Sequence, residues 1–216
     1  MVYNLSEINS LVGVWLRQLR DTRIQSDRLR FRRNLERLGE VTAYEISKEL
    51  EYDRAMTSTP LGELECDQLK TQPVLATILR AGLPLHQGLL NYFDEADCAF
   101  VASYRKHHKD GTFEIAQEYL TAPDITGRTL IMSDPMLATG ASLALGISEL
   151  LKLGRPSVIH LVSAIASTQG IELIRKKYPE VHIWTGAIDD ELTAKGYIVP
   201  GLGDAGDLCF GGKEQS

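Results

Sequence analysis

Apolar residues along the chain fall into short continuous runs, and these alternate with stretches in which apolar positions recur every three or four residues. A continuous run is typical of a strand buried on both faces, and the wider spacing is typical of an amphipathic helix. The runs lie at residues 73–79, 99–104, 129–132, 157–166 and 181–188. Helical spacing follows three of them, at 83–92, after Ser142 and at 168–178. This alternation predicts a doubly wound α/β fold with a parallel central sheet and right-handed crossovers.

The first 50 residues carry many charges, and their apolar positions have helical spacing. One apolar face is expected from Leu11, Val12, Trp15, Leu16 and Leu19. Asp21 should end this helix, and Ser26-Asp27 should cap a second one. The second helix contains Arg28, Arg30, Arg32, Arg33 and Arg37. Because apolar residues are interleaved with these arginines, an amphipathic scaffold and dimer contact is favoured over a nucleic-acid patch.

Residues 51–70 place Pro60 and Gly62 among alternating residues, which predicts a β-hairpin arm. The whole chain is expected to form one domain, residues 1–216. Within it we expect a helical scaffold (1–50), the arm (51–70), an α/β core (71–189) and a C-terminal hood (190–216).

Composition supports a globular protein and disfavours some partners. The chain has 216 residues, of which 44% are hydrophobic and 24% charged, with a formal net charge of -6. This balance argues against a general nucleic-acid surface. Cys66, Cys98 and Cys209 have neither metal nor disulfide spacing, and no signal peptide or membrane-spanning run is recognised, so we expect a cytoplasmic protein without a membrane partner.

The most informative stretch joins the run at 129–132 to the helix after Ser142. Asp134-Pro135 should end the strand, because proline cannot donate to a ladder. Thr139 and Ser142 offer hydroxyls, and Gly140 lets the backbone approach a ligand. Helix N-terminal amides attract anions, whereas the Asp134 carboxylate accepts from sugar hydroxyls. This combination predicts a site for a phosphorylated sugar.

Two arginines follow other strands. Arg80, in the turn Arg80-Ala81-Gly82, should lie at the carboxyl edge of the sheet, where its planar fork can hold a diphosphate. Arg105 follows the run at 99–104 and begins a long hairpin, residues 106–120, that could act as a lid. His107 and His108 in the tip are interpreted as part of a solvated basic loop, and His160 as a packed core histidine.

The segment Gly196-Tyr197-Ile198-Val199-Pro200-Gly201-Leu202-Gly203-Asp204-Ala205-Gly206-Asp207 is rich in glycine. We expect it to form a loop rather than a helix or an ordinary strand. Its exposed amides and carbonyls could match the edge of a flat base.

These motifs resemble the phosphoribosyltransferases, and the strings Asp-Pro-Met-Leu-Ala-Thr-Gly and Gly-Leu-Gly-Asp-Ala-Gly-Asp resemble the uracil phosphoribosyltransferase branch. The resemblance runs from about Pro73 to Lys213. It implies contacts with phosphoribosyl diphosphate (PRPP) from Arg80, Arg105, Asp134, Pro135, Met136, Leu137, Ala138, Thr139, Gly140, Ala141, Ser142 and Asp204. It implies uracil contacts from Ile198, Gly203, Asp204 and Ala205, and catalytic roles for Asp134, Arg80, Arg105 and Asp204. It also implies a non-proline cis peptide bond in the turn at residues 79–82.

The resemblance further implies uracil and PRPP as substrates, UMP and diphosphate as products, and Mg²⁺ as a cofactor that meets the protein mainly through PRPP and water. A nucleotide effector such as GTP and a homodimer or higher homo-oligomer are expected as well. Two positions depart from the pattern: Ala141 stands where the branch usually has glycine, and Ser133 stands where the wider class often has a second acid.

Two alternatives stay open on the sequence. One is a regulator that binds PRPP or UMP and controls RNA or transcription, which would need a basic face. The other is an enzyme for another base, such as a purine.

Overall fold

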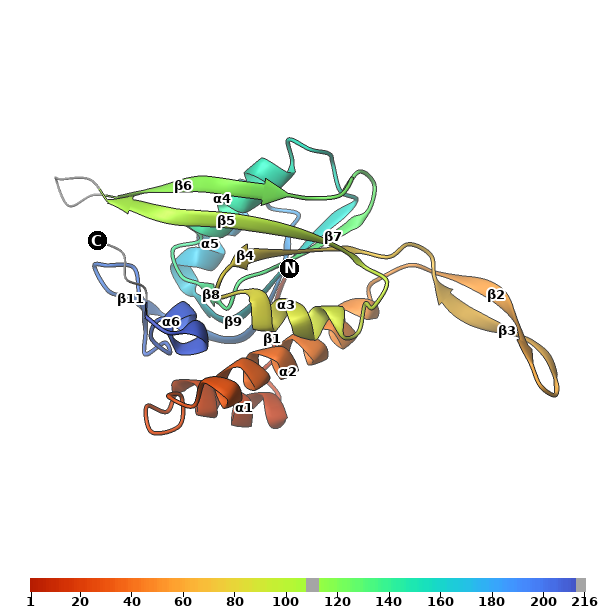
Figure 1. Cartoon of the computed structure of the whole chain (residues 1–216), viewed down its shortest axis with the longest axis horizontal. Helices are drawn as coiled ribbons and strands as arrows, with labels where there is room; N and C mark the ends of the chain where they lie inside the picture. The colour runs from red at the N-terminus through yellow and green to blue at the C-terminus, as the bar shows by residue number, and fades with distance from the viewer. Residues whose placement is uncertain (108–112, 213–216) are drawn as a thin grey trace.

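A computed structural model describes the backbone of residues 1–107 and 113–212, with side chains for the same residues except 103–118. An eight-stranded sheet forms its centre, in the order β1-β10-β9-β7-β4-β5-β6, with the short β8 paired to β9 (Figure 1). Every pair in this sheet is parallel except β5 with β6. The predicted doubly wound α/β fold is therefore confirmed.

The strands of the sheet are β1 (Val2–Asn4), β4 (Val74–Leu79), β5 (Asp97–His107), β6 (Phe113–Thr121), β7 (Thr129–Ser133), β8 (Met136–Leu137), β9 (Val158–Ser167) and β10 (His182–Asp189). The helices are α1 (Leu11–Arg20), α2 (Arg28–Ser47), α3 (Leu83–Leu90), α4 (Ala141–Leu150), α5 (Thr168–Lys177) and α6 (Ala205–Phe210). No helix within the described ranges combines the length and apolarity needed to cross a bilayer.

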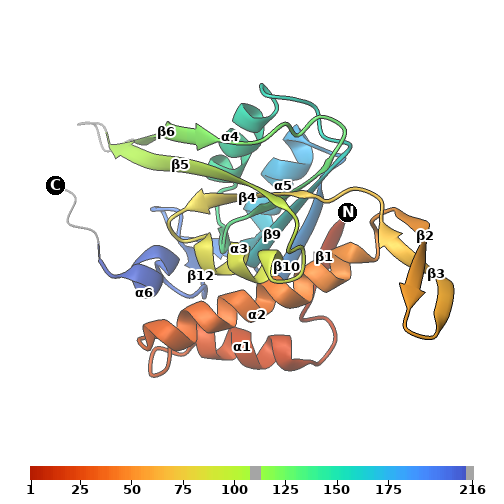
Figure 2. The same cartoon turned by 45° about the vertical axis from the view of Figure 1, so that its right-hand side comes forward.

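Helices cover both faces of the sheet, which explains the continuous apolar runs. Leu75 and Ile131 pack with α1, α2 and α3, whereas their neighbours Val74 and Leu130 pack with α4 and α5. Successive residues of a strand point to opposite faces, so a strand covered on both sides has to be apolar throughout. Figure 2 shows α1, α2 and α3 together on one side.

The N-terminal helices begin and end where the sequence predicted. The α1 cap is Ser10, whose side chain accepts from the Val12 amide, and the helix ends at Asp21. Asp27 caps α2 by accepting from the Arg30 amide. β1 was not predicted, because three residues at the edge of a sheet carry too little pattern to be recognised.

The predicted hairpin arm is present as β2 (Tyr52–Thr59) paired with β3 (Gly62–Leu69). It stands away from the body of the molecule (Figure 1).

The C-terminal segment differs from the prediction. We call residues 190–212 the hood. It contains two short paired strands, β11 (Glu191–Leu192) and β12 (Ile198–Val199), and the helix α6. The expectation of a loop throughout 196–207 was therefore wrong at both ends. Asp204 starts α6 by accepting from the Asp207 amide, a capping contact that offsets the low helix propensity of Gly206.

Candidate active site

The Arg80 turn and the loop after Asp134 lie side by side because their strands are neighbours. β4 and β7 are parallel, with Thr77 opposite Ser133. Thr77 Oγ1 donates to the Ser133 carbonyl at 3.1 Å, which holds the two strand ends together. Ligands of open α/β folds bind at this carboxyl edge. The structure therefore brings the Arg80 turn and the loop after Asp134 together at this edge.

The Arg80 turn is tightly packed. The peptide bond between Leu79 and Arg80 is cis, as expected from the resemblance. A Cβ atom at Gly82 would lie 2.1 Å from Thr77 Oγ1 and 2.7 Å from the Ile78 carbonyl oxygen. Only glycine fits there, so this residue sets how closely the turn follows the end of β4.

Asp134 lies half-buried just beyond β7. Burial raises the pKa of its carboxyl to about 7, and a hydrogen bond from the Met136 amide opposes this rise. A carboxyl group whose pKa is shifted toward 7 is typical of functional sites. A donor or cation beside it would favour the ionised form.

The loop from Asp134 to Ser142 is shaped by its neighbours in β9 and α5. The amide of Asp134 donates to the Val162 carbonyl at 3.0 Å, and Met136–Leu137 pairs with β9 as β8. β8 was not predicted, because a strand of two residues needs a partner that only the fold supplies. Ser167 Oγ donates to the Ala138 carbonyl at 2.6 Å.

Gly140 turns the loop into α4 with a positive φ of 78°, and no side chain caps this helix. Thr139 Oγ1 lies 3.4 Å from the Ala141 amide, a weak contact. The first amides of α4 therefore face the loop with little competition from side chains, which is the arrangement that binds phosphate.

The hood brings the base-binding candidates to the same edge. Ile198 and Ala205 are buried in the core at 4% and 3% exposure, whereas Gly203 and Asp204 are exposed. Gly203, which has no side chain, therefore presents its backbone to a ligand, whereas Ile198 and Ala205 lie within the core. The hood packs against the Arg80 turn at Gly206, where a Cβ atom would lie 3.9 Å from Ala81 Cβ.

Arg105 lies within β5 opposite Ile115 of β6, three residues beyond Ala102, which pairs with Leu79. Its side chain is outside the described part of the structure. The tip of the expected lid, residues 108–112 with His108, also lies outside the described part of the structure. The paired strands β5 and β6 on either side of the tip confirm the hairpin.

One neighbour of Arg80 was missed from the sequence. Asp207 Oδ1 lies 3.7 Å from Arg80 Nη2, and the same nitrogen donates to the Gly211 carbonyl at 3.3 Å. Asp207 Oδ1 is buried and accepts no hydrogen bond. The spacing Asp204-Ala-Gly-Asp207 is that of a helix cap and its third residue, which could have shown that α6 begins here.

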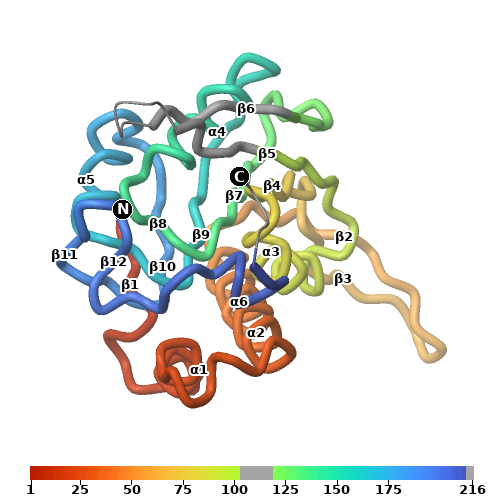
Figure 3. The backbone as a smooth tube through the Cα atoms, turned by 60° about the vertical axis from the view of Figure 1, so that its left-hand side comes forward, coloured from red at the N-terminus to blue at the C-terminus, as the bar shows by residue number. Residues whose placement is uncertain are grey.

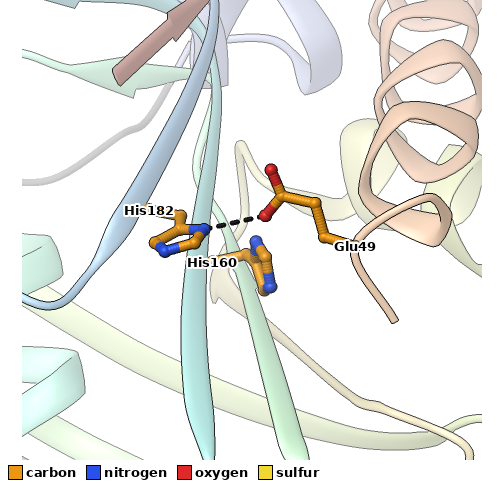
Figure 4. A group of neighbouring side chains, drawn as sticks. All are labelled: Glu49, His160 and His182. Carbon is orange, nitrogen blue, oxygen red and sulfur yellow. Dashed lines mark hydrogen bonds and ion pairs between the residues drawn. The ribbon is translucent and has the colours of Figure 1, made fainter. Parts of the chain in front are cut away.

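A second polar cluster lies near the amino ends of β9 and β10, where Glu49, His160 and His182 have ligand atoms within 4.8 Å of one another (Figure 4). His182 Nδ1 lies 2.8 Å from Glu49 Oε2, and His160 Nδ1 accepts from the Trp184 indole at 3.0 Å. A neutral imidazole that accepts at Nδ1 carries its proton on Nε2, so His160 has no lone pair left for a metal ion. His160, 1% exposed, is the packed core histidine expected from the sequence.

The parallel sheet, the phosphate-type loop after β7 and the arginine turn after β4 together define the protein class, a phosphoribosyltransferase. A family model described as uracil phosphoribosyltransferase matches residues 8–212. The chain therefore belongs to the uracil phosphoribosyltransferase family.

Individual relatives agree with this assignment. The chain is 52% identical over 213 residues to the uracil phosphoribosyltransferase of Porphyromonas gingivalis, across 98% of this chain and 99% of that protein. It is 41% identical to the protein of the same name from Pyrococcus furiosus, across 97% and 90% of the two chains. Among solved structures, the AQ2163 protein of Aquifex aeolicus matches all of both chains with a TM-score of 0.88 and 31% identity.

Proposed function

We propose that this protein is a pentosyltransferase that transfers the phosphoribosyl group of PRPP to uracil, forming UMP and diphosphate in pyrimidine salvage. The observation that carries the proposal is the convergence of three segments at one edge of the sheet. These are the Arg80 turn, the loop that begins at Asp134, and the hood, which follow β4, β7 and β10 in the chain. The names of the family relatives support uracil as the base.

The reaction breaks the bond between the ribose anomeric carbon and diphosphate and forms a bond from that carbon to uracil N1, which loses its proton. Positive charge builds on the ribose and negative charge on the leaving group. Arg80 and Arg105 would stabilise the diphosphate, Asp134 would accept from the ribose hydroxyls, and the loop through Ser142 would hold the 5′-phosphate. No described residue is placed as a nucleophile, so positioning carries much of the catalysis.

Mg²⁺ is the proposed cofactor. The donors around this edge are oxygens, among them the Asp134 carboxyl and the Thr139 hydroxyl, and oxygen is the ligand that Mg²⁺ prefers. Burial raises the pKa of Asp134, and a cation nearby would offset the cost of ionising it. When bound, Mg²⁺ would neutralise charge on the departing diphosphate.

The direct test incubates the protein with PRPP, Mg²⁺ and a panel of bases, followed by separation of the nucleotide products. UMP from uracil is the expected product. Product formed from hypoxanthine or guanine instead would favour the purine alternative. Binding of RNA without turnover in a parallel filter assay would favour the regulator.

Several finer features remain part of the proposal. The exposed arm suggests a homodimer or higher homo-oligomer, which sedimentation would measure. A nucleotide effector such as GTP is proposed from the family resemblance, and assays with and without GTP would test it. A cytoplasmic location is proposed from the cysteine pattern.

A further inference from the structure

The hood is held by two charged side chains, one far from it in the sequence, Arg20, and one directly before it, Asp189. Arg20, the last residue of α1, makes a bidentate ion pair with Asp189, the last residue of β10, at 2.7 and 2.8 Å. Both groups also bind Gly201. Arg20 Nη1 donates to the Gly201 carbonyl at 3.1 Å, and the Gly201 amide donates to Asp189 Oδ2 at 3.0 Å. We call this the Arg20–Asp189 bracket.

The bracket is largely removed from water. The side chains of Arg20 and Asp189 are 24% and 7% exposed. A planar guanidinium that forms two parallel bonds to a carboxylate fixes orientation as well as distance. The amide and carbonyl of Gly201 therefore sit in a defined place relative to β10.

The residue that the bracket holds can only be glycine. Gly201 has a positive φ of 57°, and a Cβ atom there would lie 2.1 Å from the Ile198 carbonyl oxygen. The preceding Val199-Pro200 bond is cis. The next residue is held from the same side, because Gln25 Nε2 donates to the Leu202 carbonyl at 3.1 Å and to the Leu19 carbonyl at 2.8 Å.

The anchored residues stop directly before the base-binding candidates. Gly201 and Leu202 are buried, whereas Gly203 and Asp204 are exposed. A Cβ atom at Gly203 would meet only the Leu208 side chain, at 3.8 Å. Within the hood, α6 lies beside α2 (Figure 3).

We propose that Arg20 and Asp189 are positioning residues for base recognition, which set where the backbone of residues 203–205 meets the edge of uracil. The inference rests on the proposed function and gives the N-terminal helices a part in specificity. Loosening the bracket should weaken the fit of the base while leaving PRPP binding at the other loops intact.

A merely structural role makes a different prediction, and the chain offers a matched control. Arg128 is 22% exposed, pairs with Asp97, and donates to the Gln72 carbonyl at 3.2 and 3.1 Å and to the Pro73 carbonyl at 3.2 Å. It lies directly before β7, at the end of the strand opposite the site. Arg128→Gln therefore removes an arginine of similar exposure that binds a carboxylate and two backbone carbonyls, without touching the hood.

The experiment compares wild type, Arg20→Gln, Asp189→Asn, Arg20→Lys and Arg128→Gln by steady-state kinetics and urea unfolding. We expect KM for uracil to rise about tenfold or more in Arg20→Gln and Asp189→Asn, with KM for PRPP within about twofold. The ratio of kcat/KM for uracil over cytosine should fall in the same variants. Arg128→Gln should lower the free energy of unfolding but leave KM for uracil and KM for PRPP unchanged.

Equal rises in both KM values, an unchanged KM for uracil, or the same change in Arg128→Gln would overturn the proposal. If Arg20→Gln does not fold, Arg20→Lys takes its place in the test, because lysine keeps the positive charge and lacks the planar guanidinium. The same selective rise in KM for uracil is expected from it. UMP formation by the wild type is measured first, so a failure of the proposed function is seen separately from a failure of the bracket.

Discussion

At the scale of single residues, Asp134 combines a cost in stability with a role at the candidate site. Burial raises its pKa from 3.8 to about 7. Between these values the folded chain binds more protons than the unfolded chain, so this group lowers stability as the pH rises from about 4 to 7. Asp134→Asn should therefore be more stable than wild type at pH 8, by about 1–3 kcal/mol, with the difference nearly gone at pH 4.

Urea unfolding at the two pH values measures this difference. Asp124→Asn is the control, because a hydrogen bond from the Thr126 amide lowers the pKa of that carboxyl and no gain is expected. We expect Asp134→Asn to fold and to lose on the order of 10²-fold in kcat, since an amide is a poorer acceptor for ribose hydroxyls. Turnover near wild type would contradict the assigned role.

Also at this scale, Asp207 is expected to act through Arg80. Their contact of 3.7 Å joins two groups that are each 43% exposed, so its loss should hardly change stability. Asp207→Asn should raise KM for PRPP roughly three- to tenfold at similar kcat, because the guanidinium loses one of its supports. In an Arg80→Met background the same substitution should change KM by less than about twofold. Additive effects in this double-mutant cycle would show that Asp207 acts independently.

At the scale of elements, two glycines in different surroundings should respond oppositely to substitution by alanine. A Cβ atom at Gly82 would clash with Thr77 Oγ1, whereas one at Gly13, inside α1, has nothing within 4 Å. Gly82→Ala should destabilise the protein by about 2 kcal/mol or more and impair the use of PRPP. Gly13→Ala should stabilise it by about 0.5–1 kcal/mol without a kinetic effect. Unfolding midpoints and KM for PRPP test the pair, and a neutral Gly82→Ala would show that the turn tolerates displacement.

At the scale of the whole molecule, base choice is expected to follow from a hood whose open groups are backbone. A peptide N–H cannot become an acceptor, so the exchanged donor and acceptor of cytosine would leave buried groups unpaired, at roughly 1–3 kcal/mol each. We expect kcat/KM for uracil to exceed that for cytosine by on the order of 10²–10⁴. Orotate, which carries a carboxylate beside N1, is expected to be a poor substrate, and small 5-substituents should be tolerated.

The control for this prediction is Ile198, which is 4% exposed. Truncation to alanine should cost about 2–4 kcal/mol of stability and leave uracil preferred over cytosine, since the recognition is assigned to backbone. Comparable kcat/KM values for the two bases in the wild type would overturn this account of the hood.

The amino-acid sequence by itself determined the long strands and helices of the core, their order, and the site loops that follow the strands. It could do so because a strand buried on both faces must be continuously apolar, as in β4 and β9, and because Asp134-Pro135 and Gly140 impose local backbone choices. Asp27 and the spacing of apolar residues likewise set α2 through contacts a few residues apart.

Only the tertiary structure decided how distant segments support one another. β1 and β8 exist because a neighbouring strand supplies partners for two or three residues. Arg20 meets Asp189, and Arg80 meets Asp207, across separations that leave no trace in a local pattern. The physical reason is range: helix caps and apolar periodicity act between near neighbours in the chain, whereas an ion pair between the end of α1 and the end of β10 forms only after the sheet has brought both ends to one place.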